Sequence, residues 1–233
     1  MSDQIVFANR VATLQERLRA TLVAGEPVVA APAVRAAVED ALRRGETHYT
    51  DRPGILRLRE AIAAALTARF AIEADAKNDV VVSCGVIEAR FVSLQQVLEP
   101  GQTVYAPQHA DRIAGAVLLR RAEMVGTCAG ARVVYLTSGA SEEALRRELA
   151  DLSPETMVLF EVEEGSSGFH PAAMEGMAER TVTIGQLGHT SWQTGFLLSR
   201  GKTSPGMRDF KQALTICSTN LSQWAALAAM ETV

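Results

Sequence analysis

Short apolar runs rich in valine, isoleucine and leucine recur along this chain of 233 residues, with amphipathic helical segments between them. The runs lack the strict apolar and polar alternation of a sheet with one wet face, so we expect strands that are buried on both faces. Helices between consecutive strands are the crossovers that parallel pairing requires. The predicted fold is therefore an α/β domain, with a mostly parallel sheet in a three-layer α/β/α arrangement. The expected strands are 80–83, 103–106, 132–136, 157–162, 181–184 and 195–198.

Helical periodicity marks the segments between these strands. Residues 34–42 and 55–70 carry apolar side chains three and four positions apart, as in helices with one buried face. Ser141 has the residue type of an N-cap, and Glu142 and Glu143 follow it in the first turn, where the helix dipole favours acidic side chains. Further helices are expected after Gly85, over 113–121, and over a long region from about 205 to 230.

Composition limits the classes of function. With 48% hydrophobic and 21% charged residues, the chain has the composition of a soluble globular protein, and we expect one domain over residues 1–233. A net charge of −4 gives no electrostatic basis for binding nucleic acid or an anionic membrane surface. No apolar run approaches the roughly 20 residues of a membrane span, and no signal peptide pattern is present at the start. We therefore expect a cytoplasmic protein.

The common site motifs are absent. Cys84, Cys128 and Cys217 are far apart and form no CxxC pair, so we interpret them as buried structural thiols. The four histidines lack the spacing of metal ligands, and no metal site is predicted. Neither a dinucleotide-binding GxGxxG nor a P-loop motif follows a strand. Residue patterns alone therefore predict an α/β domain without an assigned site.

Several segments resemble, in family order, the large domain of class I/II aminotransferases, which are fold type I enzymes that depend on pyridoxal phosphate. Residues 80–89, VVVSCGVIEA, resemble their strand, glycine turn and helix, and residues 98–104, LEPGQTV, resemble their L-x-P-G-D-x-V step. Residues 174–185 resemble the segment that leads into the catalytic lysine loop. The resemblance runs from about residue 30 to the C-terminus. It implies that the chain is a large domain from which the C-terminal small domain is absent.

The loop that carries the catalytic lysine in this family contains no lysine here. The family reads roughly S-x-S-K-x-x-x-x-x-G-W-R-x-G, whereas residues 185–195 read GQLGHTSWQTG. Aligned on residues 184–185, the lysine position falls on His189; aligned on Trp192, it falls near Gly185. The phosphate-binding arginine that follows the tryptophan in the family corresponds to Gln193. Lys202 and Lys211 are interpreted as surface residues. The resemblance thus implies that the amine needed for covalent cofactor attachment is missing.

The resemblance also locates the cofactor phosphate. It is expected at the turn of Gly85, Val86 and Ile87, where amides at a helix N-terminus can receive an anion. The family usually has small or hydroxylic side chains there, but this chain has valine and isoleucine. Tyr49 corresponds to a tyrosine that often reaches the phosphate across a dimer interface.

The groups that hold the cofactor ring are harder to match. The stacking aromatic corresponds to Asp111, which cannot stack. The asparagine and the aspartate that contact the ring should both fall within residues 158–169, which is too short for both segments. Glu161 or Glu163 can stand where the aspartate was.

We interpret these coordinated losses as an aminotransferase-like protein that no longer carries out transamination and has no cofactor, with pyridoxal phosphate as the alternative. Such a pseudoenzyme would act as a homodimer, or as a heterodimer with an aminotransferase-like subunit. One alternative is a remodelled enzyme that uses Glu161, Glu163, His189 or Cys84 as acid, base or nucleophile. The other is an aminotransferase still active on an amino acid, with pyridoxal phosphate bound noncovalently or through an unexpected lysine.

Overall fold

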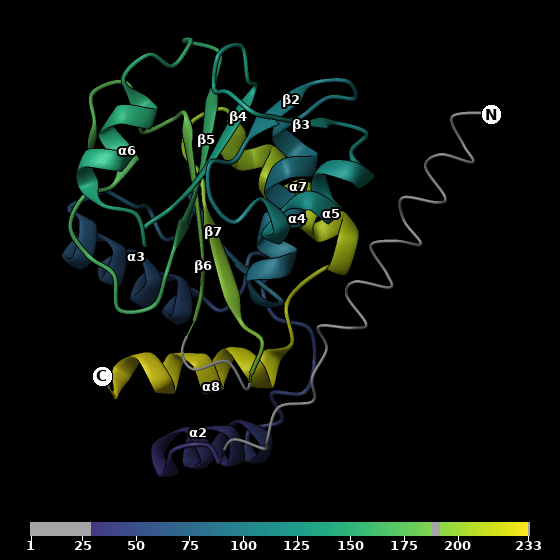
Figure 1. The fold of residues 1–233 in the computed structure, drawn as a ribbon. Helices are drawn as coiled ribbons and strands as arrows, with labels where there is room; N and C mark the ends of the chain where they lie inside the picture. Colours follow the sequence, from purple (N-terminus) through teal and green to yellow (C-terminus); the bar gives the residue numbers. More distant parts are fainter. Residues whose placement is uncertain (1–28, 188–191, 233) are drawn as a thin grey trace.

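A seven-stranded sheet forms the centre of the protein, in a computed structural model that describes residues 29–187 and 192–232 (Figure 1). The strand order is β1-β7-β6-β5-β4-β2-β3. Strand β7 is antiparallel to β1 and β6, and the other described pairs are parallel, which confirms the predicted mostly parallel sheet. The strands are β1 Val80–Ser83, β2 Thr103–Tyr105, β3 Glu123–Val125, β4 Val133–Thr137, β5 Met157–Val162, β6 Thr181–Gln186 and β7 Gly195–Leu198.

Helices cover both faces of the sheet, so the predicted three-layer arrangement is also confirmed (Figure 1). Side chains of α3, α6 and α8 belong to the buried cluster on one face, and those of α4, α5 and α7 to the cluster on the other. Neighbouring residues of β5 alternate between the clusters: Val158 and Phe160 belong to one and Leu159 to the other. The helices are α2 Pro32–Arg43, α3 Leu56–Phe70, α4 Gly85–Val97, α5 Ala114–Leu119, α6 Glu142–Leu149, α7 Thr203–Thr215 and α8 Asn220–Glu231, with 3-10 turns η1 Ala110–Arg112 and η2 Pro171–Ala173.

Two elements differ from the sequence prediction. Strand β3 lies at the edge of the sheet and is mostly exposed, so it carries no apolar run that periodicity could detect. The predicted long C-terminal helix is two helices, because Ile216 has a φ of 55° and ends α7. The Ser218 hydroxyl in the connection donates to the Val82 carbonyl at 3.0 Å, which fastens the break to β1.

Glycines bring β7 against the start of α4. A Cβ added to Gly195 would lie 2.6 Å from the carbonyl carbon of Gly85, closer than two such atoms can approach. Gly85 itself has a φ of 78°, a left-handed conformation that favours glycine. Backbone therefore packs directly on backbone where β7 begins, and this contact joins the turn before α4 to the loop between β6 and β7.

The three cysteines are more exposed to solvent than predicted. Cys84 is exposed, and Cys128 and Cys217 are only partly buried, so the prediction of buried thiols is wrong. Cys84 is exposed because it occupies the N-cap position of α4, at the end of its strand rather than in the core. In the described ranges, no helix combines the length and apolar character needed to cross a bilayer.

Candidate functional site

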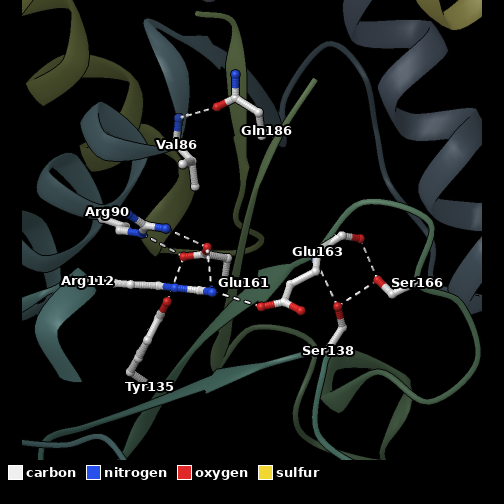
Figure 2. Close-up of polar contacts among 9 residues, drawn as sticks. All are labelled: Val86, Arg90, Arg112, Tyr135, Ser138, Glu161, Glu163, Ser166 and Gln186. Carbon is white, nitrogen blue, oxygen red and sulfur yellow. Dashed lines mark hydrogen bonds and ion pairs between the residues drawn. The ribbon is translucent and has the colours of Figure 1, made fainter. Parts of the chain in front are cut away.

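The candidate site lies at the edge of the sheet where β4, β5 and β6 end and α4 begins (Figure 2). Strand β1 runs in the same direction as β6, because β7 is antiparallel to both. The carboxyl ends of these strands therefore meet at one edge, beside the N-terminus of α4, which follows β1 directly. Open α/β sheets bind ligands at such an edge.

Glu161, near the end of β5, is the centre of an ion cluster (Figure 2). Arg90 of α4 donates two hydrogen bonds to its buried carboxylate, from Nε at 2.7 Å and from Nη2 at 2.6 Å. The Tyr135 hydroxyl on β4 donates a third at 2.7 Å, and Nη1 of Arg112 lies 3.3 Å from Oε1. Both carboxylate oxygens are thus engaged within the protein.

Protonation states in this cluster follow from its charges. Burial raises the pKa of Glu161, but the hydrogen bonds and charge of Arg90, together with Tyr135 and Arg112, outweigh burial and hold that pKa below its ordinary value. Burial, and then the Glu161 carboxylate, raise the pKa of Tyr135. At neutral pH Glu161 is therefore an anion and Tyr135 a neutral hydroxyl, which disfavours proton exchange by either group.

Glu163, just beyond β5, belongs to the same cluster. Its Oε1 is 2.9 Å from Nη1 of Arg112, so Arg112 bridges the two glutamates. The Glu163 amide donates to the Ser138 hydroxyl at 2.8 Å, and the Ser166 hydroxyl donates to the Glu163 carbonyl at 2.7 Å. These bonds fasten the loop after β5 to the end of β4 (Figure 2).

The predicted phosphate turn begins α4, and the Val86 amide in it and the Cys84 amide directly before it have acceptors inside the protein. The Val86 amide, one residue after Gly85, donates to Oε1 of Gln186 at 3.0 Å. The Cys84 amide donates to Oε2 of Glu88 at 2.6 Å. An incoming anion would have to displace these two side chains before it could use the same amides.

Two other predicted cofactor-binding residues are exposed. Ile87, in the first turn of α4, is 75% exposed, and Tyr49, between α2 and α3, is 78% exposed. Neither side chain is buried against the site within this chain. The predicted contact of Tyr49 across a dimer interface remains a prediction.

Cys84 lines a cavity of about 220 Å³ and does not join the ion cluster. Neither Glu161 nor Glu163 lines this cavity, so the structure does not bring the predicted nucleophile together with the predicted acids. His189 lies outside the described residues, and its role stays a prediction. The other described residues that line the cavity are Trp192, Gln193, Thr194, Ser218, Thr219 and Ser222.

All three lysines of the chain are described, and each lies outside the ion cluster. Lys77 and Lys202 are exposed. Lys211 is fully buried, so its interpretation as a surface residue is wrong. Its Nζ donates to the Thr215 hydroxyl at 2.7 Å and lies 3.8 Å from Oε2 of Glu88, and this pairing is what permits its burial.

Sequence reasoning missed Arg90, Arg112 and Tyr135, the partners of Glu161. One signal was available. A glutamate inside an apolar strand is buried on folding, and a buried carboxylate requires a cation or hydrogen-bond donors. That rule predicts partners for Glu161 but does not say which of the twenty arginines provides them, because Arg90 and Glu161 are 71 residues apart.

The fold and part of the chain match known proteins. A profile described as aminotransferase class I and II matches residues 11–111. The crystal structure of an aromatic aminotransferase from Pyrococcus horikoshii superposes with a TM-score of 0.77 at 25% identity, covering 94% of this chain and 70% of that one. The chain is thus similar to class I and II aminotransferases, in sequence over residues 11–111 and in fold over most of its length.

Curated members of the aminotransferase family show how much of a relative the chain represents. Aromatic-amino-acid aminotransferase 2 of Thermococcus litoralis is 26% identical over 88% of this chain and 63% of its own length. A probable N-succinyldiaminopimelate aminotransferase of Mycobacterium tuberculosis is 28% identical over 86% of this chain and 60% of its own length. The chain thus spans less than two thirds of either relative.

The residues present do not fit the aminotransferase cofactor, pyridoxal phosphate. Glu161, one of the two glutamates predicted to replace the ring-binding aspartate, already bonds Arg90 and Tyr135. Glu163, the other, is paired with Arg112. Arg112 reaches the site from η1, whereas Asp111 beside it is exposed. The amides of Val86, in the predicted phosphate turn, and of Cys84, before it, have internal acceptors. The ring nitrogen and the phosphate of the cofactor would thus both compete with contacts that the protein makes internally.

Proposed function

We propose that this aminotransferase-like protein has lost transamination dependent on pyridoxal phosphate and serves as a folded scaffold or partner subunit. The observation that carries the proposal is the placement of the three lysines. Lys77 and Lys202 are exposed, and Lys211 is buried in contact with Thr215 and Glu88. None lies in the loop where the family's lysine would stand, so no lysine amine is placed where the family attaches its cofactor.

The ion cluster supports the same proposal. A carboxylate that is to bind a ring nitrogen, or to act as a base, needs a free oxygen and an accessible proton path. Glu161 has both oxygens engaged by Arg90 and Tyr135, and its pKa is lowered. The cluster is therefore better suited to holding α4 against β4 and β5 than to chemistry.

A remodelled enzyme receives no support from the described geometry. It would need the predicted nucleophile and the predicted acids in one cleft. Cys84 lines a cavity without Glu161 or Glu163, and Glu163 is itself paired with Arg112. The described residues therefore offer no assembled pair of nucleophile and base.

Exposed apolar side chains support a role in assembly. Tyr49, Ile87, Leu214 and Ile216 are each between 46% and 78% exposed. Ile87 lies in the first turn of α4, Leu214 lies in the last turn of α7, and Ile216 directly follows α7; the two helices pack together. Apolar side chains gathered on a protein surface are typical of contacts with another protein. We propose a homodimer, or a heterodimer with an aminotransferase-like subunit.

The decisive experiment is a titration of the purified protein with pyridoxal phosphate. Absorbance spectra are recorded before and after borohydride, and peptide mass spectrometry searches for a reduced adduct on each lysine. A catalytically active family member provides the positive control. We expect no reducible adduct and no amino-group transfer from any amino acid tested. An adduct on Lys77, Lys202 or Lys211, or measurable transfer, would overturn the proposal in favour of an active aminotransferase.

The proposed dimer is tested by a separate measurement. Size-exclusion chromatography with light scattering reports the mass in solution, and Tyr49→Ser with Ile87→Ser tests the exposed side chains. We expect a dimer that these two changes weaken. A monomer at all concentrations, both alone and mixed with a candidate aminotransferase subunit, would rule out the assembly role.

A further inference from the structure

We propose that the chain supplies its own anion at the start of α4. In this proposal the carboxylate of Glu88, with the ammonium of Lys211 behind it, is the anion at the N-cap of α4, directly before the predicted phosphate turn, and it excludes external phosphate. The inference rests on the proposed loss of the cofactor, and it explains how the turn is completed without one.

The first step concerns the helix N-terminus. Helix α4 has 13 residues, and its first amides carry the partial positive charge of a helix N-terminus. The Cys84 amide donates to Oε2 of Glu88 at 2.6 Å. A negative side chain therefore accepts from the first amide at this end, as a bound anion would. The Val86 amide donates instead to the neutral side chain of Gln186 at 3.0 Å.

The second step concerns the buried cation. The side chain of Lys211 is 0% exposed and that of Glu88 is 9% exposed, with Nζ 3.8 Å from Oε2. Thr215 lies between them: its hydroxyl accepts from Lys211 at 2.7 Å and donates to Oε1 of Glu88 at 2.9 Å. A buried ammonium requires an anion close by. Glu88 is thus the counter-ion of both the helix N-terminus and Lys211.

The third step concerns an external anion. A phosphate placed at this turn would bring a second negative group against Glu88, and like charges at such short range repel strongly where water is limited. Gln193, at the position of the phosphate-binding arginine, carries no charge that could offset the repulsion. Removal of the Glu88 carboxylate should therefore leave Lys211 and the Cys84 amide without an anion, and so create affinity for one.

Thermal unfolding with and without inorganic phosphate tests the proposal, with chloride added to hold the ionic strength constant. We expect Glu88→Ala to lower the Tm by roughly 10 °C, because it leaves a buried cation unpaired. Phosphate should restore part of this loss, whereas the natural chain should show no change beyond that in chloride. In Glu88→Ala/Lys211→Met the phosphate response should disappear, because the cation is gone.

Glu142→Ala is the matched control, since Glu142 also lies in the first turn of a helix but is exposed and forms an exposed ion pair with Arg146. It should behave as the natural chain. If Glu88→Ala is folded by circular dichroism and phosphate affects it no more than Glu142→Ala, the proposal is wrong. If Glu88→Ala does not fold, Glu88→Gln replaces it, because an amide oxygen can still accept from Cys84 without the charge. Glu88→Gln should then respond to phosphate, and an absent response would overturn the proposal.

The two proposals fail in different ways. A reducible pyridoxal phosphate adduct in the natural chain would contradict the loss of the cofactor, whatever the phosphate experiment shows. Equal phosphate effects in the natural chain and in the Glu88 variants would contradict the internal anion, while the loss of transamination would stand.

Discussion

Arg90 and Glu161 form a bidentate ion pair, with hydrogen bonds of 2.7 Å and 2.6 Å. This ion pair joins the first turns of α4 to the end of β5. Their side chains are 13% and 7% exposed. The ion pair lies where β4, β5 and β6 end, and it occupies the Glu161 carboxylate with a contact inside the protein.

Removing one member of this pair should be more harmful than removing both. We expect Arg90→Met to destabilise the protein by about 3 kcal/mol, because Glu161 remains buried with fewer partners. Arg90→Met/Glu161→Leu should cost less than the single change. Denaturant unfolding measures both, and Arg146→Met, which breaks an exposed pair with Glu142, should change stability by less than about 1 kcal/mol. A double variant less stable than Arg90→Met would contradict this account.

Gly195 should not tolerate even one added carbon. A Cβ at this position would lie 2.6 Å from the Gly85 carbonyl carbon, so Gly195→Ala must push β7 away from α4. We expect a loss of about 1–3 kcal/mol in unfolding free energy. Gly115→Ala is the control: its Cβ meets nothing within 4 Å, and it lies in α5, where alanine should stabilise by up to about 1 kcal/mol. Equal effects at the two glycines would count against the close contact.

His170 should make stability depend on acid pH. Burial lowers its pKa from 6.5 to about 3, and its ring is held by the Ala172 amide and the Thr183 hydroxyl. Between these values the unfolded chain binds a proton that the folded chain does not, so stability falls as pH drops from 6.5 towards 3, by up to about 1.4 kcal/mol per pH unit. Above pH 6.5 the histidine contributes no pH dependence.

Denaturant unfolding across this pH range measures the effect. His170→Gln should remove part of the slope, whereas His48→Gln, at an exposed histidine, should leave it unchanged. If the slope between pH 4 and pH 6 is the same in all three proteins, the buried histidine is not its cause.

Cys84 should be the most reactive thiol of the described chain. It is exposed at the N-cap of α4, whereas Cys128 and Cys217 are partly buried. We expect a thiol reagent to label Cys84 first, as located by peptide mass spectrometry, and Cys84→Ser to remove the fast phase. Faster labelling of Cys128 or Cys217 in the folded protein would show that Cys84 is not the most reactive thiol.

Local patterns explain how much could be predicted. The apolar runs of β4, β5 and β6 and the N-cap at Ser141, whose hydroxyl accepts from Ala144, are local features and were predicted correctly. Strand β3 was missed because it has only three residues, lies at the edge of the sheet and is mostly exposed. Such a strand carries no apolar run that a sequence pattern could reveal.

The site depended on contacts that no local pattern encodes. Arg90 meets Glu161 only because α4 packs on the sheet, mainly over β6 and β7, and Lys211 meets Glu88 only because α7 packs against α4. A lysine that is polar in the sequence can be buried once such a partner exists. Sequence patterns therefore locate the ends of β4, β5 and β6, where the candidate site lies. Tertiary packing determines which charged side chains meet there.

The place of β7 in the sheet has a consequence for synthesis of the chain. Within the described sheet β1 pairs with β7 alone, so strand 80–83 has no neighbour until residue 198 has been made. A pairing so distant in sequence is slow to form, and the unpaired strand is exposed to wrong association during that time. During synthesis, β1 therefore stays unpaired until β7 has been made. A ribosome-bound chain that stops short of β7 would expose the apolar strand β1 to chaperones.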